Sequence, residues 1–173
     1  PPDIVKYIML YCLDTYNEKG ESGKHGTSRM AMMFLSNWLN EFGRVKNFPI
    51  HCEYLTGAQV FLGQTSRITA GLQQGGVAVV RLIYGSWHYA LLTGTDDHRV
   101  ELFDPYYRKR PFPQPDIEMV TGQEDRVNRR VAWSALNRAG RTMYALGPEE
   151  TREAVLLFNS ATRSGGDAIE YFI

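Results

Sequence analysis

A histidine and an aspartate stand at the ends of two neighbouring apolar segments near the middle of the chain. His88 opens the stretch HYALLTG, Asp104 closes the stretch VELFD, and a polar turn at Thr95–Arg99 separates them. If both stretches are strands that pair through this turn, the two side chains lie side by side at one edge of a sheet. A carboxylate beside an imidazole fixes its tautomer and stabilises the imidazolium, as in a catalytic triad. The spacing therefore predicts a general base at His88 that is oriented by Asp104.

The N-terminus of a buried helix is one place in a fold that would suit the nucleophile of such a triad. There the free amides and the helix dipole stabilise a thiolate and, later, the oxyanion. A helix is predicted from Thr27 or Ser28, and His25 stands two or three residues before its start, where a nucleophilic cysteine would be expected. We therefore expect the amides of His25, Gly26 and Thr27 to be oxyanion donors. His25 itself would be a second acid–base group or a ligand.

The elements that must position these residues follow from periodicity, caps and turn residues. Helices are predicted over Asp3–Tyr16, from Thr27 or Ser28 to Phe42, over Ser66–Gln74 and over Arg126–Ala139. Strands are predicted over Val77–Tyr84, Trp87–Gly94, Val100–Phe103, Thr142–Leu146 and Ala154–Asn159. Phe48–Gly63 is expected to alternate loop with short apolar pieces, and Pro105–Pro115 to be a surface loop. The second helix is apolar on more than one face, which is typical of a helix buried in the centre of a domain. Helices followed by antiparallel strands indicate an α+β fold.

Composition predicts one soluble globular domain over residues 1–173, with a core at about 21–159 and a tail at 160–173. Of the residues, 43% are hydrophobic and 22% charged, and 19 basic residues balance 19 acidic ones. No excess charge would attract nucleic acid or an anionic membrane, and no apolar run is long enough to span a bilayer. Two cysteines, Cys12 and Cys52, form neither a disulfide framework nor a CxxC pair, which favours a reducing compartment such as the cytoplasm. No cofactor is indicated.

The helix start and the strand pair together resemble papain-like cysteine peptidases of the C39 type and related bacterial effector proteases. In that family the helix opens with a Cys-Gly pair, small residues and Ala-Met, and HGTSRMAM at His25–Met32 is similar, with His25 at the place of the cysteine. The family's histidine, apolar run and Asp-Pro are matched by His88 and by Asp104–Pro105, and GGVAVV at Gly75–Val80 is similar to its central strand entry. The resemblance implies a papain-like fold. It also implies a peptide or amide ligand in a cleft between the helix that starts near Thr27 and the sheet.

Three interpretations of the missing cysteine stay open. The chain is a peptidase scaffold that binds a peptide or protein without cleaving it. Alternatively, His25, His88 and Asp104 hold a catalytic zinc or non-haem iron, as in a metal-dependent hydrolase or oxygenase. In the third interpretation an active enzyme uses another nucleophile. The alternative nucleophiles are Cys12, Ser22, Thr27 and Ser28.

Two further features indicate contacts with a ligand or partner. Trp87, next to His88, would form a wall of a substrate cleft. The basic, proline-rich loop Pro105–Pro115 carries residue types that are favoured in protein interfaces, so the chain would also suit a non-catalytic interaction domain. Its candidate contact residues are Tyr106, Tyr107, Arg108 and Arg110.

Overall fold

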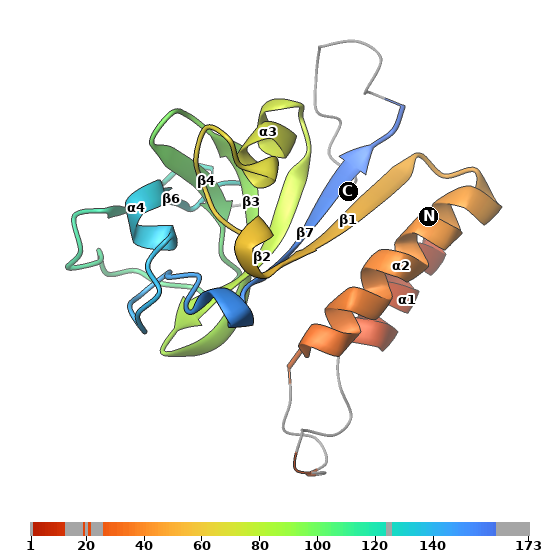
Figure 1. The fold of residues 1–173 in the computed structure, drawn as a ribbon, viewed down its shortest axis with the longest axis horizontal. Helices are drawn as coiled ribbons and strands as arrows, with labels where there is room; N and C mark the ends of the chain where they lie inside the picture. The colour runs from red at the N-terminus through yellow and green to blue at the C-terminus, as the bar shows by residue number, and fades with distance from the viewer. Residues whose placement is uncertain (1, 13–18, 20, 22–25, 124–125, 162–173) are drawn as a thin grey trace.

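Seven antiparallel strands form one open sheet in a computed structural model of the chain, which describes residues 2–12, 19, 21, 26–123 and 126–161 (Figure 1). The strand order is β1-β7-β2-β3-β4-β6-β5. The strands are β1 (Ile50–Thr56), β2 (Val77–Tyr84), β3 (Ser86–Thr95), β4 (Arg99–Phe103), β5 (Ile117–Met119), β6 (Arg129–Ala132) and β7 (Glu153–Asn159). The α-helices are α1 (Pro2–Cys12), α2 (Arg29–Lys46), α3 (Arg67–Gln73) and α4 (Trp133–Leu136). The predicted α+β class is confirmed.

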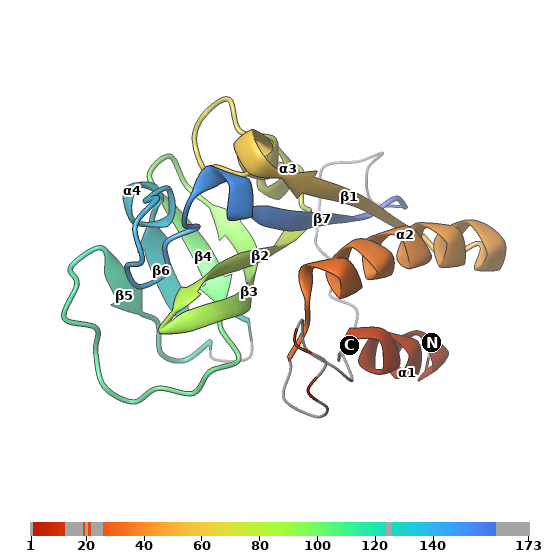
Figure 2. The ribbon, with the colours of Figure 1, turned by 60° about the horizontal axis from the view of Figure 1, so that its bottom comes forward.

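Different helices cover the two faces of the sheet. Side chains alternate between the faces along each strand, so neighbours on β7 enter different cores. Leu156 belongs to the larger core, together with residues of α3 and α4. Val155 belongs to a smaller core, together with Ile4 of α1 and Leu39 of α2. Figure 2 shows this layering, with α3 and α4 on one side of the strands and α1 and α2 on the other.

Helix α2 packs on the sheet along one side only, so the prediction of a centrally buried helix is wrong. Ala31, Leu35 and Leu39 are buried, whereas Met30 is 74% exposed. The sheet covers one face of α2 and α1 covers part of another, which leaves the rest of its apolar surface in solvent. The predicted cap is confirmed, because the Ser28 hydroxyl accepts a hydrogen bond of 3.1 Å from the Ala31 amide.

The central hairpin has the predicted form. Strand β2 begins and ends as expected, and β3 and β4 pair antiparallel through the turn between them. The Asp96 carboxylate closes this turn by accepting hydrogen bonds from the amides of His98 and Arg99, at 2.7 and 2.6 Å. This pairing sets His88 and Asp104 on neighbouring strands.

Other elements differ from the sequence predictions. Within Phe48–Gly63, where only short apolar pieces between loops were expected, Ile50–Thr56 forms the whole strand β1. The expected helix over Arg126–Ala139 contains β6 followed by the single turn of α4. Along β6 buried and exposed residues alternate, a pattern too short to be told from a helix in the sequence alone. The expected strand Thr142–Leu146 forms no sheet strand, although its backbone bonds to Ile83 of β2. Within the described ranges, none of the helices has the length and apolarity needed to cross a bilayer.

Candidate functional site

His88 and Asp104 form a hydrogen-bonded pair on the face of the sheet that carries the larger core. The distance from His88 Nε2 to Asp104 Oδ1 is 2.7 Å. The two side chains meet because Leu91 of β3 pairs with Phe103 of β4, which places Asp104 opposite Ala90 and on the same face as His88. The Asp104 side chain has no exposed surface, whereas the imidazole is 23% exposed. The pair therefore has a buried carboxylate and a base that solvent can reach.

Several donors surround the Asp104 carboxylate. Oδ2 accepts a hydrogen bond of 2.5 Å from the Tyr144 hydroxyl, and Oδ1 also accepts one of 2.7 Å from the Tyr106 amide. Burial by itself raises the pKa of Asp104, but the hydrogen bonds from His88, Tyr144 and the Tyr106 amide outweigh it and hold this pKa below its ordinary value. Asp104 is therefore ionised at neutral pH despite its burial.

An ionised Asp104 determines which nitrogen of His88 is the base. The carboxylate only accepts hydrogen bonds, so Nε2 carries the proton and Nδ1 holds the free lone pair. Within the described part of the chain, Asp104 is the hydrogen-bond partner of the imidazole and nothing engages Nδ1. The ring also lies against Tyr84, at 5.8 Å between centroids. Nδ1 is thus available to a substrate or a nucleophile.

Tyr144 belongs to the site, although the sequence analysis did not predict it. Its backbone has a φ of 61°, which is uncommon for a tyrosine, and its side chain is fully buried. The amide donates to the carbonyl of Ile83 at 2.7 Å, while the hydroxyl reaches Asp104. Burial and the neighbouring Asp104 carboxylate raise the pKa of Tyr144, so its hydroxyl remains a donor. Such strained residues are concentrated at functional sites.

A cluster of aromatic rings lies on one side of the pair, where Tyr84 contacts the imidazole. The Tyr84 ring lies 4.9 Å from that of Tyr106 and 5.7 Å from that of Tyr144, and Phe112 lies 5.5 Å from Tyr144. Arg108 lies at the edge of this group, 3.4 Å from the Tyr84 hydroxyl. Of the predicted contact residues, Tyr106 and Arg108 therefore contribute to the wall of the site. Tyr107 and Arg110 lie exposed on the same loop.

The start of α2 lies at the opposite face of the sheet. Arg29 Nε is 3.7 Å from Glu153 Oε2, and the buried Glu153 carboxylate accepts hydrogen bonds from the hydroxyls of Tyr54 and Tyr89. Tyr89 follows His88 on β3, so the two side chains point to different faces. The described residues thus do not place Gly26 and Thr27 against His88, as the expected cleft would require, and His25 lies outside the described residues.

Trp87 likewise lies across the sheet from the imidazole of its neighbour His88. Its ring packs against the Arg81 guanidinium, with 3.9 Å between the guanidinium carbon and the ring centroid. The Trp87 ring is therefore held in place by packing against Arg81. Trp87 does not form the predicted wall beside His88.

The alternative nucleophiles do not approach His88 in the described part of the chain. Ser28 is occupied as a helix cap, and Cys12 ends α1 with its thiol 3.7 Å from the Met9 carbonyl. Ser22 lies outside the described residues. Burial raises the pKa of Cys52 to about 12, so this thiol stays protonated. Among the described residues, no three His, Cys, Asp or Glu side chains are close enough to hold a metal ion.

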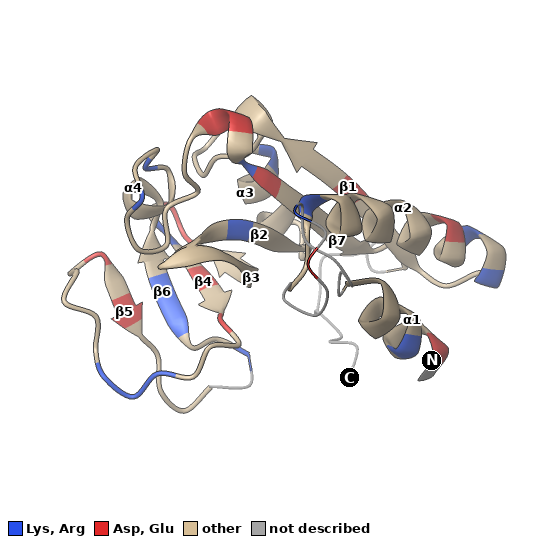
Figure 3. Cartoon of the chain, turned by 90° about the horizontal axis from the view of Figure 1, so that it is seen from below, with Lys and Arg blue, Asp and Glu red and all other residues tan. Residues whose placement is uncertain are grey.

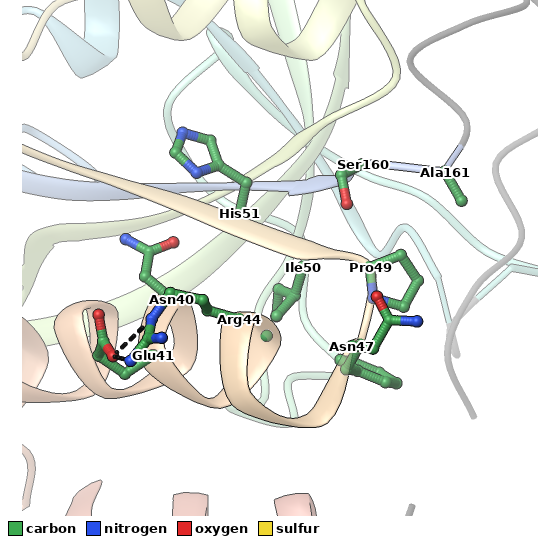
Figure 4. A pocket seen from close by; sticks show the side chains of 11 residues that line it. Asn40, Glu41, Arg44, Asn47, Pro49, Ile50, His51, Ser160 and Ala161 are labelled. Atoms are coloured by element: carbon green, nitrogen blue, oxygen red, sulfur yellow. Dashed lines mark hydrogen bonds and ion pairs between the residues drawn. The ribbon is translucent and has the colours of Figure 1, made fainter.

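A hollow of about 750 Å³ lies away from the pair, where α2 ends and β1 begins (Figure 4). Some of its polar side chains are already hydrogen-bonded within the fold. Arg44 donates to Glu41 at 2.6 Å, and Asn40 exchanges hydrogen bonds of 2.9 and 2.7 Å with the backbone of Cys52. A second hollow, of about 430 Å³, lies beside Asp104.

Comparison with known proteins found no match for this chain among protein-family models, curated proteins or solved structures. Its function is therefore inferred from the geometry of the site.

Proposed function

We propose that this protein hydrolyses peptide or amide bonds, with His88 as the general base and Asp104 as the residue that orients it. One observation carries the proposal: a carboxylate without solvent exposure binds Nε2 of a partly exposed imidazole at 2.7 Å. A buried carboxylate that stays charged stabilises the imidazolium that forms when His88 accepts a proton. The resemblance to papain-like peptidases of the C39 type supports the proposal through the same strand pair.

The proton transfers follow from the tautomer. Nδ1 of His88 takes a proton from the attacking hydroxyl or water as the new bond to the carbonyl carbon forms. Asp104 then faces an imidazolium and stabilises its charge. The imidazolium returns the proton to the leaving nitrogen as the carbon–nitrogen bond breaks, which regenerates the neutral base.

The described residues favour water as the attacking group. No hydroxyl or thiol in the described ranges forms a hydrogen bond with His88, and the position of the family's cysteine is taken by His25. A general base that activates water needs no covalent intermediate. In this proposal the papain-like ancestry accounts for the strand pair, and the reaction no longer depends on a thiol.

Turnover of a library of fluorogenic peptide amides tests the proposal. We expect His88→Ala to lower kcat/KM by at least about 100-fold, the usual contribution of a positioned base. His51→Ala is the matched control, because His51 also lies near a carboxylate, 3.8 Å from Glu53, but is half-exposed and outside the site. A parallel series with a chelator and with a thiol-alkylating agent should leave turnover unchanged.

Each other result contradicts part of the proposal. Loss of turnover with the chelator would favour a metal-dependent hydrolase, and loss on alkylation would restore a cysteine mechanism. Equal activity of the His88→Ala and wild-type proteins would remove His88 from the chemistry. If no peptide is turned over but some are bound, the chain is a binding domain that retains the strand pair of a peptidase.

A further inference from the structure

The hollow of about 430 Å³ beside Asp104 has basic walls. Three of its lining residues are cationic: Arg108 and Lys109 on the loop between β4 and β5, and Arg129 on β6. The one acid in the wall, Asp104, has its carboxylate fully buried and bonded to its own donors. Figure 3 shows basic residues on this loop and on β6, at the end of the molecule away from α1 and α2. A ligand in the hollow therefore meets positive charge.

Arg129 is a buried cation without a carboxylate partner in the described part of the chain. It is 2% exposed, and its terminal nitrogens donate to the carbonyls of Asn128 and Tyr106, at 2.7 and 3.2 Å, beside the Tyr144 hydroxyl. Its Nε forms no hydrogen bond. Arg152 is the instructive comparison, because all three of its nitrogens donate to carbonyls. Arg152 is thus satisfied within the fold, while Arg129 retains an unused donor.

Several other arginines in the described part of the chain are paired with acids. Such pairs join Arg44 to Glu41, Arg67 to Glu53, Arg99 to Glu118, Arg130 to Glu101 and Arg138 to Asp116. Arg108 instead bonds to carbonyl oxygens and to the Tyr84 hydroxyl, and the Lys109 ammonium lies 5.9 Å from the Tyr107 ring centroid. Neither has an ion pair with a described residue. Three cations without an ion pair to a described residue therefore meet at this hollow.

We propose that this hollow binds a carboxylate group of the peptide ligand. The assignment of the ligand as a peptide rests on the proposed function, whereas the preference for an anion rests on the hollow alone. A carboxylate suits the site because it accepts hydrogen bonds from ammonium and guanidinium groups and neutralises their charge. The carboxylate has two sources, an acidic side chain or the C-terminus of the peptide.

The test measures binding to the full chain carrying His88→Ala, so that no probe is consumed. The probes are acetyl-Gly-Glu-Gly-amide, its neutral Gln counterpart, and acetyl-Gly-Gly-Gly with a free C-terminal carboxylate. Titrations followed by amide chemical shifts report both the Kd and the position of binding, through Val120 and Thr121 in the wall of the hollow. We expect at least one anionic probe to bind about tenfold more tightly than the neutral one, with shifts at this wall.

Charge variants identify the residues responsible. Lys109→Gln and Arg108→Gln should each weaken binding of the anionic probe several-fold, and added salt should do the same. Arg110→Gln is the matched control, since Arg110 is exposed on the same loop but does not line the hollow. Equal affinity for all probes, or equal losses in all three variants, would overturn the proposal. If the hollow binds anions but the protein turns over no substrate, the proposal of a carboxylate site is supported and the proposal of a hydrolase is rejected.

Discussion

Asp104 is a buried carboxylate that stays charged because its neighbours donate hydrogen bonds to both of its oxygens. The imidazole and the Tyr106 amide bond to Oδ1, and the Tyr144 hydroxyl bonds to Oδ2. Burial raises the pKa of Asp104 and these hydrogen bonds lower it, so the removal of any one donor would raise this pKa. At the scale of single residues, the site depends on a few hydrogen bonds that keep the Asp104 carboxylate ionised. The stability of the fold should therefore depend on pH.

Asp104 should therefore contribute to stability in a pH-dependent way. Its pKa is lower in the folded chain than in the unfolded chain, so the folded state binds fewer protons between the two values. This stability is fully present above the unfolded pKa, about pH 4, and is lost as the pH falls through the lower folded value. Urea unfolding over a pH series should show this loss in the wild type and a smaller one in Asp104→Asn.

At neutral pH, Asp104→Asn should lower the free energy of unfolding by about 1–3 kcal/mol, because it leaves donors without their charged acceptor. Glu150→Gln, at an exposed carboxylate, controls for the removal of one negative charge. Parallel stability curves for the Asp104→Asn and wild-type proteins below pH 4 would contradict the role of these hydrogen bonds.

The strands that position His88 and Asp104 could be predicted from sequence, because each is marked by residues that lie close together in the chain. Strands β2 to β4 are apolar and closely spaced, and the polar turn at Asp96 joins the last two, so His88 and Asp104 could be placed together from sequence. Tyr144 and Arg129 could not, because they reach the site from segments that contact it only through the tertiary fold. The burial of each face of α2 was likewise unpredictable, since it depends on which face of the sheet receives the helix.

The contact between the end of α2 and the start of β1 is close enough to test by adding one methyl group. A Cβ at Gly43 would lie 2.8 Å from the backbone oxygen of Ile50 and 3.0 Å from that of Phe48. Alanine favours a helix by about 1 kcal/mol, but moving backbone costs about 1–3 kcal/mol. We expect Gly43→Ala to lower the free energy of unfolding, measured by denaturant titration.

Gly140→Ala is the control for this change, because a Cβ at Gly140 meets nothing within 4 Å. It should change the free energy of unfolding by less than about 0.5 kcal/mol. A Gly43→Ala protein as stable as the wild type would mean that moving β1 away from α2 costs no more than alanine gains from its higher helix propensity.

The whole molecule has two cores of unequal size, one on each face of the sheet. The larger core encloses the interior of β2, where Ala78, Val80 and Leu82 are fully buried. In the smaller core Ile4 is the buried residue of α1, while its neighbours Val5, Met9 and Leu10 are each more than half exposed. The site is attached to the larger core, so its geometry does not depend on α1.

Hydrogen exchange should separate the two layers. The amides of α1 are expected to exchange at least about 100-fold faster than those of β2, through local opening that leaves the sheet intact. The exchange of α1 should also depend little on low concentrations of urea. Equal protection of α1 and β2 would instead show that the two layers unfold as one unit.

The Asn128 side chain forms the same pair of hydrogen bonds with the Asp104 backbone that a neighbouring strand would form. Its side-chain amide accepts from the Asp104 amide and donates to the Asp104 carbonyl, both at 2.8 Å, which reproduces the paired exchange of an antiparallel ladder. The sheet thus gains one rung made by a side chain, after β4 has ended at Phe103. The peptide unit that carries the carboxylate is thereby anchored independently of the loop that follows. Loops of other lengths and charges could be grafted after Tyr106 to change what the protein binds, while the His88–Asp104 pair keeps its geometry and its bond from the Tyr106 amide.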